Sequence, residues 1–73
     1  MNDETVKLIV GEIRKNVDSE RIIFNDNFGQ IIINISESQN FNGHHHGLTE
    51  SFSGSIINNQ IIIHLANGTS QIL

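Results

Sequence analysis

The segment with the most unusual residue types for chemistry is the run Gly-His-His-His-Gly at residues 43–47. Three adjacent histidines are rarely needed for packing, and imidazole is a good ligand for zinc, nickel and copper ions. Consecutive residues of an extended chain point to alternate sides, so one chain presents at most His44 and His46 to a single ion. These two residues are therefore the candidate metal ligands. A site would need a further ligand from one of four sources: His64, Glu50, Glu37 or a second copy of the chain.

Three other interpretations of this segment stay open. In the first, the segment is a solvated polar loop without a ligand. In the second, it is a pH-sensitive contact, since histidine changes its charge between pH 5 and 8. It also fits recognition of a small anionic ligand by imidazoles and glycine backbone amides, because glycine lets the chain wrap closely around a ligand. If the segment folds over the sheet, His64 and His45 come together. The candidate ligand-binding residues are Gly43, His44, His45, His46, Gly47 and His64.

Motifs of the common enzyme classes are absent. The sequence has no P-loop, no dinucleotide fingerprint, no serine nucleophile elbow and no cysteine. Its carboxylates lie mostly in the expected helix and loops, with no apolar pattern around a pair of them. We therefore expect a protein that is not an enzyme.

Length and composition predict one small domain over residues 1–73. A chain of this size buries only about 60% of the surface that it exposes when unfolded, so oligomerisation or a metal is expected to add stability. A net charge of −4 with only four Lys and Arg residues gives no basic footprint for nucleic acid. The apolar runs are too short to cross a bilayer, and the acidic start MNDETVK is unlike a signal peptide. These features, with the absence of cysteine, lead us to expect a cytoplasmic protein.

The elements that must position the histidines begin with an amphipathic helix over residues 3–17. Its apolar residues recur at the helical spacing of three and four positions. Asn2 is the expected N-cap, and Asp3 follows it in the first turn, where the helix dipole favours negative charge. Arg14 lies at the complementary end.

From residue 20 the apolar period changes to two, which is typical of strands. Residues 20–36 predict a β-hairpin that turns at Asp26-Asn27, and residues 48–73 predict a β-meander. In between, residues 37–47 have no period and are expected to form a polar, histidine-containing loop.

Two type I′ turns are expected in the meander, at Asn58-Asn59 and at Asn67-Gly68. The second turn pairs Ile63 with Ile72. Together with the first hairpin, these turns predict one core face for the helix to cover. Its expected members are Ile22, Phe24, Ile31, Ile33, Phe52, Ile56, Ile61, Ile63, Leu65 and Ile72.

The predicted fold is therefore an α+β domain, with one N-terminal amphipathic helix packed on an antiparallel β-meander of about five strands. The short helix followed by a twisted meander, with the ending NGTSQIL, resembles Sm-like and other small barrels. This resemblance implies a strongly twisted or barrel-like sheet, but it transfers no function.

The second face of the predicted sheet is more apolar than an exposed face should be, and strands apolar on both faces are usually buried on both. We therefore expect it to contact a partner, most economically a second copy in a symmetric dimer or higher oligomer. The candidate interface residues are Ile23, Ile32, Ile57, Ile62 and Leu73.

Three functional hypotheses follow. The first is a non-enzymatic binding module that acts as a homo-oligomer, such as a phage or mobile-element accessory protein that inhibits a host protein or sequesters a small anionic ligand. The second is a protein that binds metal through the histidine loop. The third is a structural protein that assembles through its isoleucine-rich strands.

Overall fold

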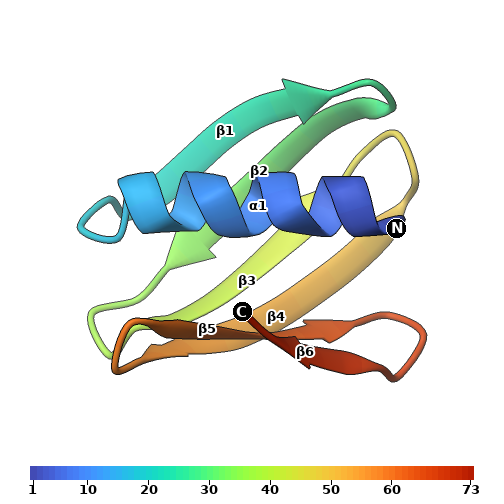
Figure 1. The fold of residues 1–73 in the computed structure, drawn as a ribbon. Coiled ribbons are helices and arrows are strands. Elements are labelled where there is room, and N and C mark those ends of the chain that lie inside the picture. The colour runs from blue at the N-terminus through green and yellow to red at the C-terminus, as the bar shows by residue number, and fades with distance from the viewer.

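The computed structural model describes all 73 residues as one helix and a six-stranded antiparallel sheet (Figure 1). The strands follow one another across the sheet in chain order, as a meander. The α+β class is confirmed, and the strand count is six rather than five. The helix is neither long nor apolar enough to span a bilayer. The elements are α1 (Asp3–Lys15), β1 (Arg21–Asp26), β2 (Gly29–Ile35), β3 (Asn40–His45), β4 (Glu50–Ile57), β5 (Gln60–Leu65) and β6 (Ser70–Ile72).

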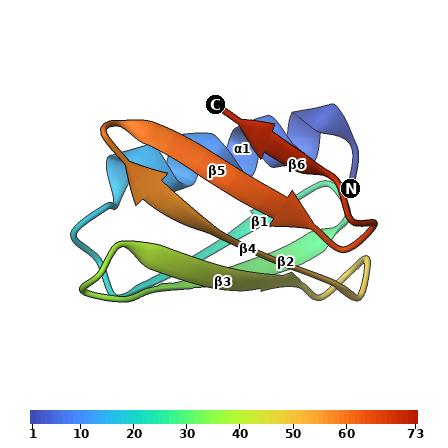
Figure 2. The same ribbon diagram turned by 90° about the horizontal axis from the view of Figure 1, so that it is seen from below.

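The sheet curves around the helix without closing. Figure 2 shows β5 and β6 turned toward α1, which lies across one face of the sheet. The Arg14 guanidinium donates hydrogen bonds of 2.7 Å to the main-chain oxygens of Asn59 and Leu73. Since β1 and β6 are not paired with each other, the expected barrel-like closure is not observed. The helix fills the concave side, so the edge strands remain apart.

Helix α1 forms for the reasons that its sequence predicts. The side chain of Asn2 accepts a hydrogen bond of 2.8 Å from the amide of Thr5, and Asp3 and Glu4 occupy the first turn. The helix ends at Lys15 rather than at residue 17, because the amide of Asn16 bonds to the carbonyl of Ile13 and caps it. Its apolar side packs on the sheet and forms the core with residues from five of the strands. The buried core is Val6, Ile9, Val10, Ile13, Ile22, Ile31, Ile33, Ile35, Phe41, Phe52, Ile61 and Ile63.

Strand β3 corrects the expectation of a loop over residues 37–47. It pairs with β2 on one side and β4 on the other, so it lies in the middle of the sheet. Its inward residues are Phe41, Gly43 and His45, a set without apolar alternation. Gly43 lies opposite Phe52 on β4, and a Cβ atom on Gly43 would lie 2.3 Å from the Phe52 ring. The phenylalanine thus fills the space above the glycine, which is how a glycine is accommodated in this strand.

The hairpin turns decide which residues face the helix. The Asn58-Asn59 turn is as predicted, since both residues have positive φ and Ile56 pairs with Ile61. The β1–β2 turn lies at Asn27-Phe28, one residue later than expected. The register therefore shifts by two residues, which leaves the face of each side chain unchanged.

The β5–β6 turn reverses a prediction. Gly68 alone has positive φ, and the amide of Leu65 bonds to the carbonyl of Thr69, so the loop is one residue longer than a type I′ turn. Pairing then shifts by one residue and places Ile72 opposite Ile62. Such a slip moves every side chain to the other face. Ile72 is therefore exposed rather than in the core. Leu73 exchanges two main-chain hydrogen bonds with the core residue Ile61, so it lies on the helix side rather than on the second face.

The contact of Gly43 with Phe52 can be tested by replacing Gly43 with alanine. We expect Gly43→Ala to lower the free energy of unfolding by about 1–3 kcal/mol, because the added methyl group displaces a buried ring. The matched control is Gly11→Ala, since a Cβ atom there meets nothing within 4 Å. That change should raise stability by up to about 1 kcal/mol. Urea unfolding measures both, and equal effects at the two positions would contradict the packing role of Gly43.

Candidate functional site

The face of the sheet that α1 leaves uncovered, here called the open face, carries one continuous polar row. The row crosses all six strands, because each member lies opposite the next in the strand pairing. Side chains opposite one another on neighbouring strands have Cβ atoms about 4.5–5.5 Å apart, so they can share a ligand. The row consists of Arg21, Asn34, Asn42, Ser53, His64 and Ser70.

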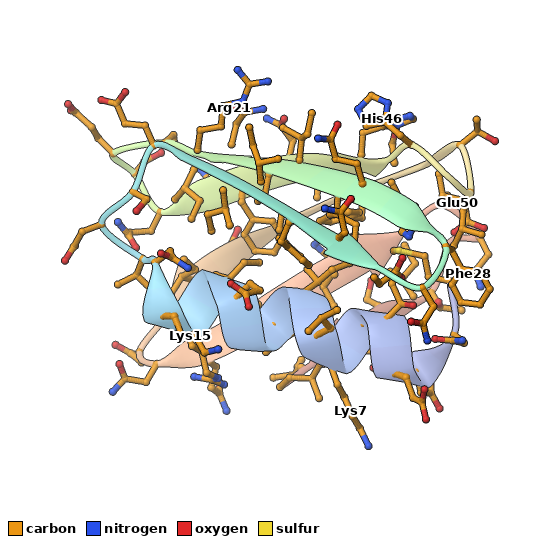
Figure 3. The ribbon with its side chains drawn as sticks, turned by 90° about the horizontal axis from the view of Figure 1, so that it is seen from above. Lys7, Lys15, Arg21, Phe28, His46 and Glu50 are labelled. Atoms are coloured by element: carbon orange, nitrogen blue, oxygen red, sulfur yellow. The ribbon has the colours of Figure 1, made fainter.

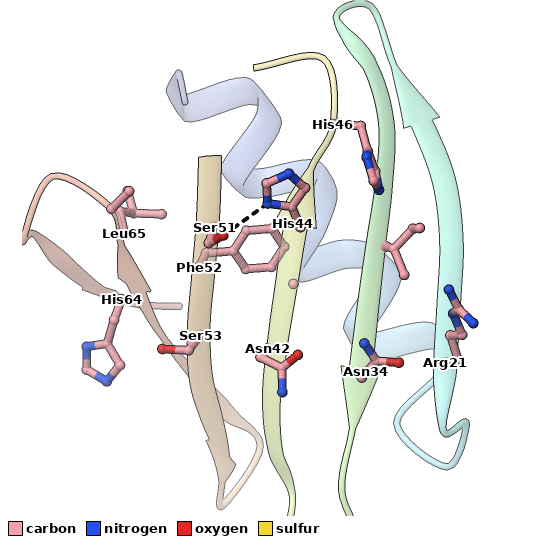
Figure 4. A pocket seen from close by; sticks show the side chains of 13 residues that line it. Arg21, Asn34, Asn42, His44, His46, Ser51, Phe52, Ser53, His64 and Leu65 are labelled. Carbon is pink, nitrogen blue, oxygen red and sulfur yellow. Dashed lines mark hydrogen bonds between the residues drawn. The ribbon is translucent and has the colours of Figure 1, made fainter. Parts of the chain in front are cut away.

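A shallow depression of about 830 Å³ lies over this row (Figure 4). It extends from β1 to the end of β5, and most of its lining side chains are polar. His44 and His46 border it at one end, next to Ile32. The full lining is Arg21, Ile32, Asn34, Asn42, Gly43, His44, His46, Ser51, Phe52, Ser53, His64, Leu65 and Ala66.

The charge of this face is opposite to that of the whole chain. The protein carries a net charge of −4, yet no Asp or Glu residue lines the depression. Arg21 is its permanent cation, and the other Lys and Arg residues all belong to α1. Figure 3 shows Arg21 and His46 pointing away from the helix, on the side opposite to Lys7 and Lys15. The open face is therefore the part of the molecule suited to a negatively charged group.

Two histidines of the open face are held by serines on the next strand. The Nδ1 atom of His44 lies 3.0 Å from the hydroxyl of Ser51, and that of His64 lies 2.7 Å from the hydroxyl of Ser70. Each imidazole keeps its Nε2 atom for a ligand. Neither pair has a carboxylate on the second nitrogen, which the serine–histidine–aspartate arrangement of hydrolases uses.

His46 lies beside His44, at the end of the depression next to Ile32. Its ring centroid lies 4.9 Å from that of His44, with the rings edge to face. Alternation along the strand brings these two side chains to one face, as the sequence predicts. No group of three or more His, Cys, Asp or Glu residues in the structure could hold a metal ion. A metal at this pair would therefore need ligands from outside the chain.

His45 points to the opposite face from its neighbours and is completely buried. Its Nε2 donates a hydrogen bond of 2.9 Å to Asp26, and its Nδ1 accepts one of 3.3 Å from the amide of Leu48. Because Nδ1 accepts, the proton of the neutral ring lies on Nε2. The expectation that His45 meets His64 is therefore wrong: the strand alternation places them on opposite faces of the sheet.

The partner of His45, Asp26, is the most connected side chain of the protein. Its Oδ1 also accepts hydrogen bonds from the amides of Phe28 and Gly29, and its Oδ2 accepts one of 2.9 Å from the hydroxyl of Thr5. Burial favours the neutral acid, but the hydrogen bonds from His45, Phe28 and Thr5 outweigh it and hold the pKa of Asp26 below its ordinary value of 3.8. One carboxylate thus ties the helix, the first hairpin and β3 together.

At both glycines of the histidine segment, a Cβ atom would collide with neighbouring atoms. Gly43 lies under Phe52, as described above, and also lines the depression. A Cβ atom on Gly47 would lie 1.6 Å from the carbonyl oxygen of Phe28, so this position admits no other residue without a shift of the β1–β2 turn. These two contacts hold the main chain on either side of the three histidines.

The isoleucines of the open face differ in exposure, and one of them, Ile32, lines the depression. Ile23 is 54% exposed and Ile57 is 51% exposed, whereas Ile32 and Ile62 are half-buried. Sequence reasoning found these residues but missed the polar row, whose members Arg21, Asn34, Asn42 and Ser53 lie on four different strands. The alternation of polar residues at positions 40, 42 and 44 was the signal that could have revealed it.

Comparisons with protein-family models, with curated proteins and with solved structures find no match. The function must therefore be inferred from the site itself.

The role of Asp26 can be tested through the pH dependence of stability. Its pKa is lower in the folded chain than the ordinary value of 3.8, so folding favours the ionised form. The stability that it contributes is complete at neutral pH and is lost as the pH falls through the ordinary value toward the lower folded one. We expect Asp26→Asn to lower the free energy of unfolding at pH 7 by about 1.5–3 kcal/mol. It should also flatten the acid limb of stability between about pH 5 and 2.

Urea unfolding at a series of pH values measures this effect. The matched control is Asp18→Asn, because Asp18 is exposed and forms no ion pair. An acid limb that is unchanged in Asp26→Asn, or equally flattened in the control, would show that another group governs it.

Proposed function

We propose that this chain is a non-enzymatic binding module that holds a small anionic ligand on its open face. The observation that carries the proposal is the depression in which Arg21 and the histidines 44, 46 and 64 surround a row of amide and hydroxyl groups with no carboxylate among them. In a chain of net charge −4, this distribution makes the depression a favourable place for an anion.

The chemistry of the lining supports an anionic group such as phosphate. An arginine guanidinium matches the geometry of a phosphate or carboxylate with two parallel hydrogen bonds. The amides of Asn34 and Asn42 supply further donors across the same row. The Nε2 atoms of His44 and His64 also donate when the serine hydroxyls donate to Nδ1. The strands also fix the spacing of these donors, which lowers the entropy cost of binding.

Binding rather than catalysis is favoured by the openness of the face. A catalytic site usually excludes water from its reacting groups, whereas Arg21, Asn34, Asn42 and His64 are all exposed. A small acidic protein with one anion-binding face fits an accessory role, such as an inhibitor or a protein that sequesters a small charged signal.

The proposal predicts that inorganic phosphate binds at the open face. In a titration followed by ¹H–¹⁵N NMR, we expect shifts at the side chains of Arg21, Asn34 and Asn42. Arg21→Gln should weaken binding about tenfold or more, since a charged hydrogen bond is lost. The matched control Lys7→Gln removes an equal charge from α1 and should leave the affinity unchanged.

Two outcomes would contradict this proposal. One is a titration in which phosphate shifts no open-face residue at any pH. The other is an equal loss of affinity in Arg21→Gln and Lys7→Gln, which would indicate only a response to total charge.

A transition metal is the second candidate ligand, and the distance between His44 and His46 favours it. Imidazole nitrogens lie about 2.0–2.1 Å from zinc, and two such rings at ordinary angles have centroids about 4.5–5.2 Å apart. The observed separation of 4.9 Å lies within this range. The remaining ligands would come from solvent or from a second copy of the chain.

The metal alternative predicts zinc binding that depends on these two histidines alone. Calorimetry with Zn²⁺ should show heat that His44→Gln or His46→Gln removes. His64→Gln is the matched control, because His64 lies on β5, two strands from His44, and should bind as the parent does. Equal loss in all three variants would contradict a two-histidine site, and no heat in the parent would remove the metal alternative while leaving the phosphate test unaffected.

A further inference from the structure

The outer edge of β1 presents main-chain hydrogen-bonding groups that have no partner within the chain. The carbonyl of Glu20 accepts a bond of 2.9 Å from the amide of Ile35, which fixes the alternation along the strand. Residues 20, 22, 24 and 26 therefore bond to β2. The N–H and C=O groups of Arg21, Ile23 and Asn25 point outward. In Figure 3, which is seen from above, no other element lies over this edge.

The middle of this edge lacks the features by which proteins usually protect edge strands. Natural edges carry charges, a proline, a bulge or a covering loop. The two charged residues of β1, Arg21 and Asp26, lie at its ends. Between them β1 pairs with β2 without a bulge or a proline, and its centre is Ile23, which is 54% exposed. The other edge strand, β6, spans only Ser70–Ile72, and Arg14 binds the adjoining Leu73 oxygen.

We propose that β1 pairs in antiparallel fashion with β1 of a second copy of the chain, around a two-fold axis through Ile23. This register places Ile23 opposite Ile23 of the second copy. It places Arg21 opposite Asn25 of the second copy, and the reverse pair follows from symmetry. The three pairs form about six main-chain hydrogen bonds between the two chains.

The side chains select this register over its neighbours. On the open face, the guanidinium of Arg21 meets the amide of Asn25, and isoleucine meets isoleucine. On the helix side, Ile22 lies opposite Phe24 of the second copy, so apolar residues meet there as well. A slip of two residues either way would place Ile23 against Arg21 or Asn25 and lose this match.

The pairing has a consequence for the whole molecule. It extends the sheet through the two-fold axis and joins the two open faces into one surface. Ile23 was expected at an oligomer interface, and this arrangement gives it a contact made by the strand edge rather than by the face. The main-chain hydrogen bonds of the pairing use the edge alone, so they do not require an anion on the open face.

A single strand pair forms a small interface, so we expect a weak dimer in equilibrium with the monomer. Sedimentation of the full chain over a range of concentrations should show this equilibrium. NMR hydrogen exchange should locate it: the Ile23 amide gains protection as concentration rises, whereas the Ile22 amide, bonded to β2, is protected throughout.

Substitutions separate the edge from the face. Ile23→Pro removes an outward N–H and spares the bonds to β2, and Ile23→Lys keeps the N–H but adds an edge charge. Each should weaken dimerisation at least tenfold, with circular dichroism confirming the fold. Ile57→Lys, at an isoleucine of similar exposure on β4, is the matched control and should dimerise as the parent does.

The inference is overturned if the parent is monomeric at every concentration. It is also overturned if Ile57→Lys dissociates the dimer and Ile23→Lys does not, since the open face would then be the interface. A dimer whose Ile23 amide exchanges at the same rate as in the monomer would equally rule out the β1 edge.

Discussion

The buried carboxylate of Asp26 is the interaction on which the rest of the structure depends. It lies at the end of β1 and accepts hydrogen bonds from the helix, from its own turn and from His45 on β3. A buried charge is costly unless such partners surround it, so the three segments must meet at this point. Once His45 is drawn inward, the alternation of the strand turns His44 and His46 outward, and the candidate site follows from this orientation.

The division of the molecule into two unlike faces follows from one helix and six strands. A single helix covers only one side of the sheet, and the sheet curves around it through the packing of Phe41 and Phe52 over glycines of neighbouring strands. The other side stays open and takes the polar residues of every strand. The helix also keeps Lys7, Arg14 and Lys15 away from that side, which leaves Arg21 as its cation.

The two surfaces inferred to bind partners differ in the groups that they present. The open face presents side chains of fixed spacing, which suits a small ligand with several acceptors. The β1 edge presents main-chain groups, which suit another strand and select it through register. Arg21 belongs to both surfaces, since its side chain lines the depression and its main chain lies on the edge. Ligand binding and pairing therefore meet at the Arg21 guanidinium, which lines the depression and faces Asn25 of the second copy in the proposed dimer.

The sequence by itself determined the elements whose signals are local. The cap at Asn2, the helical spacing of α1 and the Asn58-Asn59 turn each depend on neighbouring residues, and all three are observed. Only the tertiary structure decided the rest. Strand β3 has no apolar alternation because its inward positions are filled by Phe52 from β4 and by the bond of His45 to Asp26 on β1. Ile72 faces outward because a single extra loop residue reverses a strand. The polar row joins residues from six strands, and no local pattern contains such a row, because it exists only once the pairing register is set.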